Sequence, residues 1–184
     1  MNFLEKFKLV DTFIFDVDGV LTNGELMIQP DGALLRKMFV KDGYALQHAV
    51  KQGYKVAIIS GGKPLGVEQR LSNLGIEDMF YNSKDKKATY LDYVRKNKLD
   101  PEGIVFMGDD LPDYEVMRLV GIPASPNDAA IEIQEVSQYV SPFNGGQGCV
   151  RDIIEKVLRL HGRCLLYTSP SPRDQRGSRM PSSA

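Results

Sequence analysis

The stretch FIFDVDGVLT, residues 13–22, decides the fold. An apolar run ends at Phe15, and two aspartates, Asp16 and Asp18, follow one residue apart before Gly19. A short apolar run of this kind is typical of a buried strand in a parallel sheet. Two carboxylates at the end of a buried strand are unfavourable unless a ligand or a cation binds there. The stretch therefore predicts a central strand that leads into a polar site.

The composition is that of a globular protein. The chain has 184 residues, of which 42% are hydrophobic and 26% charged, and its formal net charge is -1. No apolar run approaches the ~20 residues of a membrane span, and the charge does not favour a nucleic-acid partner. Cys149 and Cys164 lie far apart and make neither a disulfide framework nor a zinc-type cluster. We therefore expect a cytoplasmic protein with no membrane or nucleic-acid partner.

The C-terminal stretch has a different composition. RCLLYTSPSPRDQRGSRMPSSA is rich in Ser, Pro and Arg, which is typical of a disordered tail. Within it, CLLYTSPSPRD resembles the translation of a transposase adapter used in sequencing libraries. We expect one domain at 1–162 and a non-native or disordered tail at 163–184. Without the tail's four arginines and one aspartate, the 23 basic and 24 acidic residues become 19 and 23, a net charge of -4.

Short apolar runs alternate with helical patterns along the rest of the chain. The runs rich in β-branched and aromatic residues are TFIFDV (12–17), YKVAII (54–59) and GIVFMG (103–108). Apolar residues recur at helical spacing in 42–53, 64–75, 86–98 and 148–162. This alternation predicts an α/β fold, a Rossmann-like three-layer α/β/α sandwich with a central parallel sheet. Two extended pieces around Pro30-Asp31-Gly32 add one projecting β-hairpin.

Four polar clusters fall where predicted strands end or helices begin. They are Asp16 with Asp18, Ser60 to Gly62, Lys86, and Asp109 with Asp110 and Asp113. Each alone has an ordinary explanation as a turn, a helix cap or a solvated side chain. Ligands of an open parallel sheet bind outside the carboxyl ends of its strands, so we expect the clusters to form one crevice.

The residue types of these clusters favour one chemistry. Several carboxylates in one crevice repel each other unless a cation neutralises them. Oxygen ligands favour a hard ion such as Mg²⁺, and a hydroxyl, loop amides and a lysine suit phosphate oxygens. One aspartate can attack phosphorus, while the other, protonated, gives a proton to the leaving alcohol and then activates water. The pattern predicts metal-dependent phosphoryl transfer.

Residues 1–162 resemble the haloacid-dehalogenase-like (HAD) phosphatases. DVDGVLT matches their first motif, Ser60 after YKVAII the second, Lys86 the third and GDDLPD the fourth. This resemblance implies that Asp16 is the nucleophile and a metal ligand, and that Asp18 is the acid/base and binds the metal through its backbone carbonyl. It implies that Asp109 is a further metal ligand, which Asp113 supports without binding the metal directly; Asp110 is a further candidate for this support. The implied phosphate-binding residues are Ser60, Gly61 and Lys86.

The connection between Asp18 and Ser60 has room only for the hairpin and one helix, so no cap domain is expected. The runs KDGYALQHAVKQG, MGDDLPDYEVM and NGGQGCVRDIIE resemble the 3-deoxy-D-manno-octulosonate 8-phosphate phosphatases. This implies Mg²⁺-dependent hydrolysis of that phosphate to the free sugar acid, through an aspartyl-phosphate, for lipopolysaccharide synthesis. It also implies a homotetramer and substrate contacts by Lys41, Asp42, Gly43, Gln47, Lys63 and Arg70. Gln47 and Gly62 stand where some relatives carry arginine, and Lys63 could supply that charge.

Other functions remain open at this point. The alternatives are a phosphatase for a nonulosonic acid 9-phosphate and a non-catalytic HAD-like module. A response-regulator receiver places its phosphorylated aspartate after a later strand, and a phosphotransferase of this superfamily normally needs a cap. The complete set of expected catalytic residues argues against the non-catalytic module.

The predicted hairpin carries apolar residues on both faces. Leu26-Met27-Ile28, Leu34-Leu35 and Met38-Phe39-Val40 are consecutive, and neighbouring residues of a strand point to opposite faces. Only one face can lie on the hairpin's own sheet, and soluble monomers seldom expose the other. We therefore expect identical hairpins to pack together in the homotetramer; the alternative is a flap that lies on its own domain.

Overall fold

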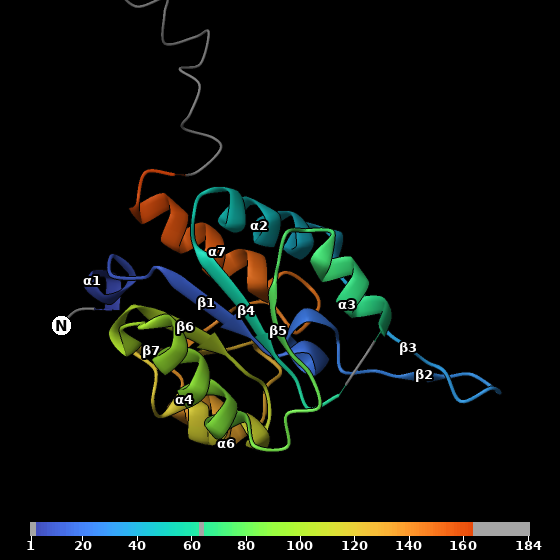
Figure 1. Cartoon of the computed structure of the whole chain (residues 1–184). Helices are drawn as coiled ribbons and strands as arrows, with labels where there is room; N and C mark the ends of the chain where they lie inside the picture. Colours follow the sequence, from blue (N-terminus) through green and yellow to red (C-terminus); the bar gives the residue numbers. More distant parts are fainter. Residues whose placement is uncertain (1–2, 63–64, 164–184) are drawn as a thin grey trace, which may run out of the picture.

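The central sheet is parallel throughout. The computed structural model of the chain describes residues 3–62 and 65–163 (Figure 1). Its six-stranded sheet has the order β5-β4-β1-β6-β7-β8. The strands are β1 (Thr12–Phe15), β4 (Lys55–Ile59), β5 (Asp78–Phe80), β6 (Ile104–Met107), β7 (Ile122–Ser125) and β8 (Tyr139–Val140). Each neighbouring pair is parallel, which confirms the predicted α/β class.

Helices cover both faces of this sheet. They are α1 (Phe3–Phe7), α2 (Val40–Lys51), α3 (Leu65–Ser72), α4 (Lys86–Asn97), α5 (Tyr114–Met117), α6 (Ile131–Val136) and α7 (Cys149–Leu160). In Figure 1, α2 and α7 lie over one face, and α4 and α6 lie over the other. The three predicted layers are therefore confirmed, and the four predicted helices correspond to α2, α3, α4 and α7.

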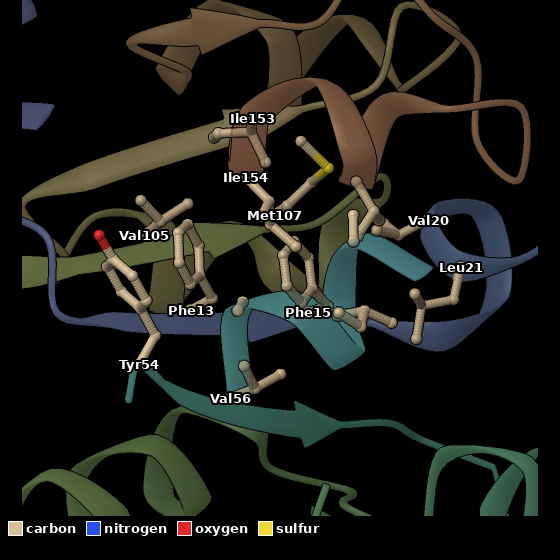
Figure 2. Packing of buried hydrophobic residues seen from close by; sticks show 14 of the residues in the cluster. Phe13, Phe15, Val20, Leu21, Tyr54, Val56, Val105, Met107, Ile153 and Ile154 are labelled. Atoms are coloured by element: carbon tan, nitrogen blue, oxygen red, sulfur yellow. The ribbon is translucent and has the colours of Figure 1, made fainter. Parts of the chain in front are cut away.

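β1 is buried from both sides, which explains its uninterrupted apolar sequence. Phe13 and Phe15 point into the layer of α2 and α7, where they pack among residues such as Val105 and Ile154 (Figure 2). Ile14 points into the opposite layer. Side chains alternate between the faces of a strand, so a central strand must be apolar at every position.

The position of β1 brings three segments distant in sequence to one edge of the sheet. β1 lies between β4 and β6, and Phe15 is in register with Ile58 and Met107. The backbone N–H of Asp16 donates to the carbonyl of Met107 (3.1 Å). The residues that follow these three strands therefore meet at the carboxyl edge of the sheet, as expected for an open α/β sheet.

The predicted hairpin is present and projects from the domain (Figure 1). Strand β2 (Met27–Ile28) pairs with β3 (Leu34–Leu35), and Gly32 in the turn has a φ of +85°. Its base is joined to the domain by an antiparallel bridge between Thr22 and Met38. The four apolar side chains of its strands are 46–74% exposed, and Leu26, just before β2, is 44% exposed. We expected one face to lie on the domain's own sheet, but the hairpin exposes apolar side chains on both faces.

Three strands, β5, β7 and β8, were not predicted from the sequence. The strands β5 and β7 include Asp78, Pro123 and Ser125, which are atypical of strands, and β8 has only two residues. No helix in 3–62 or 65–163 is long and apolar enough to cross a membrane. The predicted tail lies outside the described residues except for Arg163, whose guanidinium packs over the Tyr54 ring and donates to the Gln52 carbonyl.

Candidate active site

The loop after β1 leaves no room for side chains at Gly19. This residue has a φ of +86°, and a Cβ there would lie 1.9 Å from Oδ2 of Asp109. The DVDG turn and the GDD turn after β6 are therefore in direct contact. This close approach explains why a glycine follows the two aspartates of the first motif.

A second glycine-rich segment supports the same loop from behind. A Cβ on Gly145 would lie 1.8 Å from the Gly19 carbonyl oxygen, and the N–H of Gly146 donates to the Val20 carbonyl (2.9 Å). The segment continues into α7, whose first N–H groups donate to the buried carboxylate of Asp42. The run NGGQG is thus the backbone support of the first motif.

The predicted site residues meet in one crevice. Its volume is about 490 Å³, and it lies at the carboxyl ends of β1, β4 and β6. The residues that line it are Asp16, Asp18, Gly24, Ser60, Gly61, Gly62, Ser83, Lys84, Lys86, Asp109, Asp110, Pro112 and Asp113. This set includes every residue to which we assigned a catalytic, metal-binding or phosphate-binding role.

Lys86 links two of the carboxylates. Its Nζ lies 2.9 Å from Oδ2 of Asp16 and 2.7 Å from Oδ1 of Asp113, and all three side chains are at least nine-tenths buried. Lys86 is the first residue of α4, which begins there because the Asp85 carboxylate caps it by accepting the N–H of Ala88 (2.9 Å). Burial lowers the pKa of Lys86, but the charges of Asp16 and Asp113 outweigh this effect and raise it overall.

The acidic residues carry an excess of negative charge. Burial and the charge of Asp113 raise the pKa of Asp16 to about 7, although Lys86 acts in the opposite direction. Burial and the charges of Asp16 and Asp113 raise the pKa of Asp109 to about 8. Burial also raises the pKa of Asp113. One lysine is therefore too little to keep all three carboxylates charged at neutral pH.

The crevice fits a hard divalent cation. Asp16, Asp109 and Asp113 each place one carboxylate oxygen within 4.8 Å of the others. Such an ion would supply the missing positive charge, and oxygen atoms are its preferred ligands. The Asp18 carboxylate is not part of this cluster, which agrees with a backbone role at the metal. Asp113 is already bonded to Lys86 and accepts the N–H of Asp109 (3.3 Å).

Polar groups suited to a phosphate lie on the other side of the crevice. Ser60 directly follows β4 and is almost fully buried, and within residues 3–62 and 65–163 its Oγ accepts only a long bond from the N–H of Gly62 (3.4 Å). Its hydroxyl hydrogen is therefore available to a ligand. Asp110 is not part of the carboxylate cluster, and its carboxylate accepts the N–H of Leu111 (2.8 Å).

The predicted substrate residues that the structure describes do not line the crevice in the single chain. Lys41 is exposed over the Phe39 ring, Gln47 bonds Lys51, and Gly43 lies inside α2 beside Arg70. Arg70 borders a separate groove of about 350 Å³ between the hairpin and α3. Their role remains a prediction, and Lys63 lies outside the described residues.

Asp42 has a structural role in the single chain. Its side chain is 1% exposed, and its carboxylate accepts the N–H groups of Gly148 (3.2 Å) and Arg151 (2.8 Å). These bonds hold the N-terminus of α7 against α2. The predicted contact of Asp42 with a substrate stays a prediction.

Two cations near the crevice were not predicted from the sequence. Lys84 lines its rim, and Arg36 of the hairpin donates two hydrogen bonds to the Asp18 carboxylate. Lys84 could have been suggested by its position two residues before Lys86. Arg36 gave no such signal, because the pairing depends on how the hairpin folds back toward the first motif.

Comparison with known proteins agrees with this site. No protein-family model matches the chain. The 3-deoxy-D-manno-octulosonate 8-phosphate phosphatase KdsC of Escherichia coli is 33% identical over 160 residues, which cover 87% of this chain and 85% of that protein.

Solved structures give the same result. The 3-deoxy-D-manno-octulosonate 8-phosphate phosphatase of Yersinia pestis is 29% identical, with a TM-score of 0.84 over 87% of this chain and 86% of that one. The enzyme of that name from Moraxella catarrhalis, solved with a magnesium ion, a phosphate ion and KDO, is 30% identical, with a TM-score of 0.82 over 85% and 90% of the two chains. The chain therefore belongs to the 3-deoxy-D-manno-octulosonate 8-phosphate phosphatase family of the HAD superfamily.

Proposed function

We propose that the protein is a magnesium-dependent phosphomonoesterase that hydrolyses 3-deoxy-D-manno-octulosonate 8-phosphate. The observation that carries the proposal is the arrangement around Lys86, which holds Asp16 at the end of β1 inside a crevice lined by further carboxylates and by Ser60. The family supports the substrate, since the named relatives carry this activity in their names. The product would be a free sugar acid for lipopolysaccharide synthesis.

The side chains of the crevice suit two successive transfers. An Asp16 oxygen attacks phosphorus, the bond from phosphorus to the sugar oxygen breaks, and Asp18 gives its proton to that oxygen. Water then attacks the aspartyl-phosphate and loses a proton to Asp18, and the bond from phosphorus to Asp16 breaks to release phosphate. Lys86, Ser60 and the Gly61 N–H stabilise the phosphoryl oxygens throughout.

Asp16 and Asp109, with the backbone carbonyl of Asp18, are the proposed Mg²⁺ ligands, and Asp113 supports them through its bond to the Asp109 N–H. When bound, the ion neutralises the carboxylates and polarises the phosphoryl group. Its fit rests on the burial of the cluster and on the negative charges that lie together in it, both of which raise the pKa values of Asp16 and Asp109.

The sugar acid end of the substrate needs positive charge outside the phosphate site. We propose that Arg70 contributes from the groove beside α3, together with Lys41, Gln47 and Lys63. Arg70 has the fork geometry that binds a carboxylate with two hydrogen bonds. Neighbouring subunits would be needed to bring the more distant of these residues to the crevice.

The hairpin supports a homotetramer. Leu26, Met27, Ile28, Leu34 and Leu35 are exposed in the single chain, and three of them line a groove of about 620 Å³. Apolar surface of this kind is usually covered by another subunit, and closed symmetry is the common outcome. Because no cap domain is present, neighbouring subunits would also screen the crevice from water. The substrate, together with the buried free thiol of Cys149, favours a cytoplasmic location.

The test is phosphate release by the full chain with Mg²⁺ from a panel of sugar phosphates. The panel holds 3-deoxy-D-manno-octulosonate 8-phosphate, a nonulosonic acid 9-phosphate, a neutral hexose phosphate and p-nitrophenyl phosphate. We expect the first to give the highest kcat/KM, and Asp16→Asn to lower kcat by about three orders of magnitude or more. Asp92→Asn, the same change at an exposed position, is the matched control and should retain full turnover. A higher kcat/KM for the nonulosonic acid would reassign the substrate, and full activity in Asp16→Asn would refute the mechanism.

A further inference from the structure

Arg36 is bound to the proposed acid/base by two hydrogen bonds. Its Nε donates to Oδ1 of Asp18 (2.6 Å) and its Nη2 to Oδ2 (3.0 Å). A guanidinium and a carboxylate joined in this way share one plane, which fixes the rotation of both groups. The contact spans the gap between the hairpin and the catalytic loop.

The Arg36 side chain is enclosed, although it belongs to a projecting hairpin. Only 8% of it is exposed, whereas the Asp18 side chain is 36% exposed and open to the crevice. Gly62 borders the pair, since a Cβ there would lie 3.7 Å from Nη2 of Arg36. An exposed ion pair contributes little to stability, because ordering two mobile side chains costs entropy. An enclosed guanidinium is already ordered, so it loses little more entropy when two of its donors bind a carboxylate.

The backbone on both sides of this contact is fixed. Arg36 directly follows β3, and Met38, two residues later, forms the bridge to Thr22. The N–H of Thr22 in turn donates to the Val17 carbonyl of the catalytic loop (3.0 Å). The base of the hairpin is therefore tied to the same loop that carries Asp18.

The other carboxylates of the crevice have different supports. Lys86 holds Asp16 and Asp113, and neither contact involves the hairpin. Among the residues that the structure describes, only Arg36 donates hydrogen bonds to the Asp18 carboxylate. Without Arg36, the Asp18 carboxylate would lose both of these hydrogen bonds.

We infer that Arg36 is a positioning residue, which sets the orientation of Asp18 and so couples the hairpin to proton transfer. The inference rests on the proposed phosphatase function, in which Asp18 gives a proton to the leaving sugar oxygen; a protonated Asp18 would keep its bond to Arg36 through the oxygen that does not carry the proton. An alkoxide leaving group needs that proton, whereas p-nitrophenolate is stable without it. Loss of Arg36 should therefore affect the two kinds of substrate differently.

The experiment compares Arg36→Ala, Arg36→Lys and Lys37→Ala with the wild type. Each is assayed on p-nitrophenyl phosphate and on the sugar phosphate that the wild type cleaves best. Lys37→Ala is the matched control, because it removes a neighbouring exposed cation of the same hairpin that does not contact Asp18. The melting temperature and the oligomeric state of each variant show whether the fold and the assembly are intact.

For Arg36→Ala we expect kcat on the sugar phosphate to fall about tenfold or more, while kcat on p-nitrophenyl phosphate stays within about twofold. Arg36→Lys should recover part of the loss, because a lysine can make one of the two bonds. Equal losses on both substrates, a change in KM alone, or no change would overturn the inference. A wild type that cleaves neither substrate would refute the proposed function. A wild type that cleaves both, together with an Arg36→Ala variant whose kcat changes equally on both, would refute only the role of Arg36.

Discussion

The carboxylate of Asp42 on α2 accepts a hydrogen bond of 2.8 Å from the backbone N–H of Arg151, in the first turn of α7. No side chain of α7 itself caps this terminus. A negative charge at a helix N-terminus is favourable, because it pairs with unsatisfied N–H groups and with the helix dipole. Asp42 thereby fixes the start of α7 and the glycine segment that supports the first motif.

The first prediction concerns stability. Asp42→Ala leaves the N–H groups of Gly148 and Arg151 without their acceptor, and Gly148 is buried. We expect the free energy of unfolding to fall by about 1–3 kcal/mol. Asp92→Ala, which removes an exposed carboxylate paired with Arg95, should stay within about 0.5 kcal/mol of the wild type. Urea unfolding measures both variants, and equal stabilities would show that the cap at α7 is unimportant.

The second prediction concerns the metal. A ligand that binds only the folded state stabilises it by about 2.7 kcal/mol at a hundred times its Kd. Mg²⁺ should therefore raise the melting temperature of the wild type, and Asp109→Asn should lose most of this rise because it removes one charged ligand of the cluster. Glu115→Gln, a nearby exposed acid paired with Lys87, should behave like the wild type. An unchanged Mg²⁺ effect in Asp109→Asn would place the ion elsewhere.

The third prediction concerns pH. The pKa values of Asp16 and Asp109, about 7 and 8 in the metal-free protein, lie above the ordinary 3.8. The folded state therefore binds protons that the unfolded state has already lost, and this contribution to stability disappears as the pH rises through 7 and 8. Mg²⁺ must displace the same protons, so the Mg²⁺-induced rise in melting temperature should grow between about pH 6 and pH 9. A rise that is constant over this range would mean that these carboxyl groups are not ligands.

Much of the fold and the catalytic set could be predicted because their signals are local. The apolar run before Asp16 and the clusters at Ser60 and Asp109 each occupy a few adjacent residues. Ligands of an open parallel sheet bind at the carboxyl ends of its strands, and this rule predicts that the three segments lie close together. The strands β5, β7 and β8 were missed because they have only two to four residues, too few for a clear apolar run.

The remaining features depend on contacts between distant segments. Asp42 meets Arg151 and Arg36 meets Asp18 only after the chain has folded. The hydrogen bonds of Asp42 to α7 could not be predicted, because an acid beside a glycine in a KDG run looks the same whether it faces a ligand or a helix terminus. No spacing in the sequence distinguishes these two roles.

The fourth prediction concerns assembly. Met27→Glu or Ile28→Glu places a charge on an apolar side chain of the hairpin that is 58% or 74% exposed in the single chain. We expect each to dissociate the proposed tetramer and to lower turnover of the sugar phosphate. Leu91→Glu makes the same change at a 47% exposed position of α4 and should leave the assembly intact. Light scattering at low micromolar concentration checks this, and a fully active monomeric wild type would mean that the hairpin is only a flap.

The strand order has a consequence for synthesis on the ribosome. β1 is the first strand to emerge, yet its neighbours β4 and β6 begin at Lys55 and Ile104. Until residue 107 has left the exit tunnel, one edge of β1 has no partner, and the Asp109 turn cannot pack against Gly19. Such long-range pairing folds slowly and leaves apolar strands open to aggregation. The TFIF segment of the nascent chain therefore stays open to aggregation until β6 has emerged.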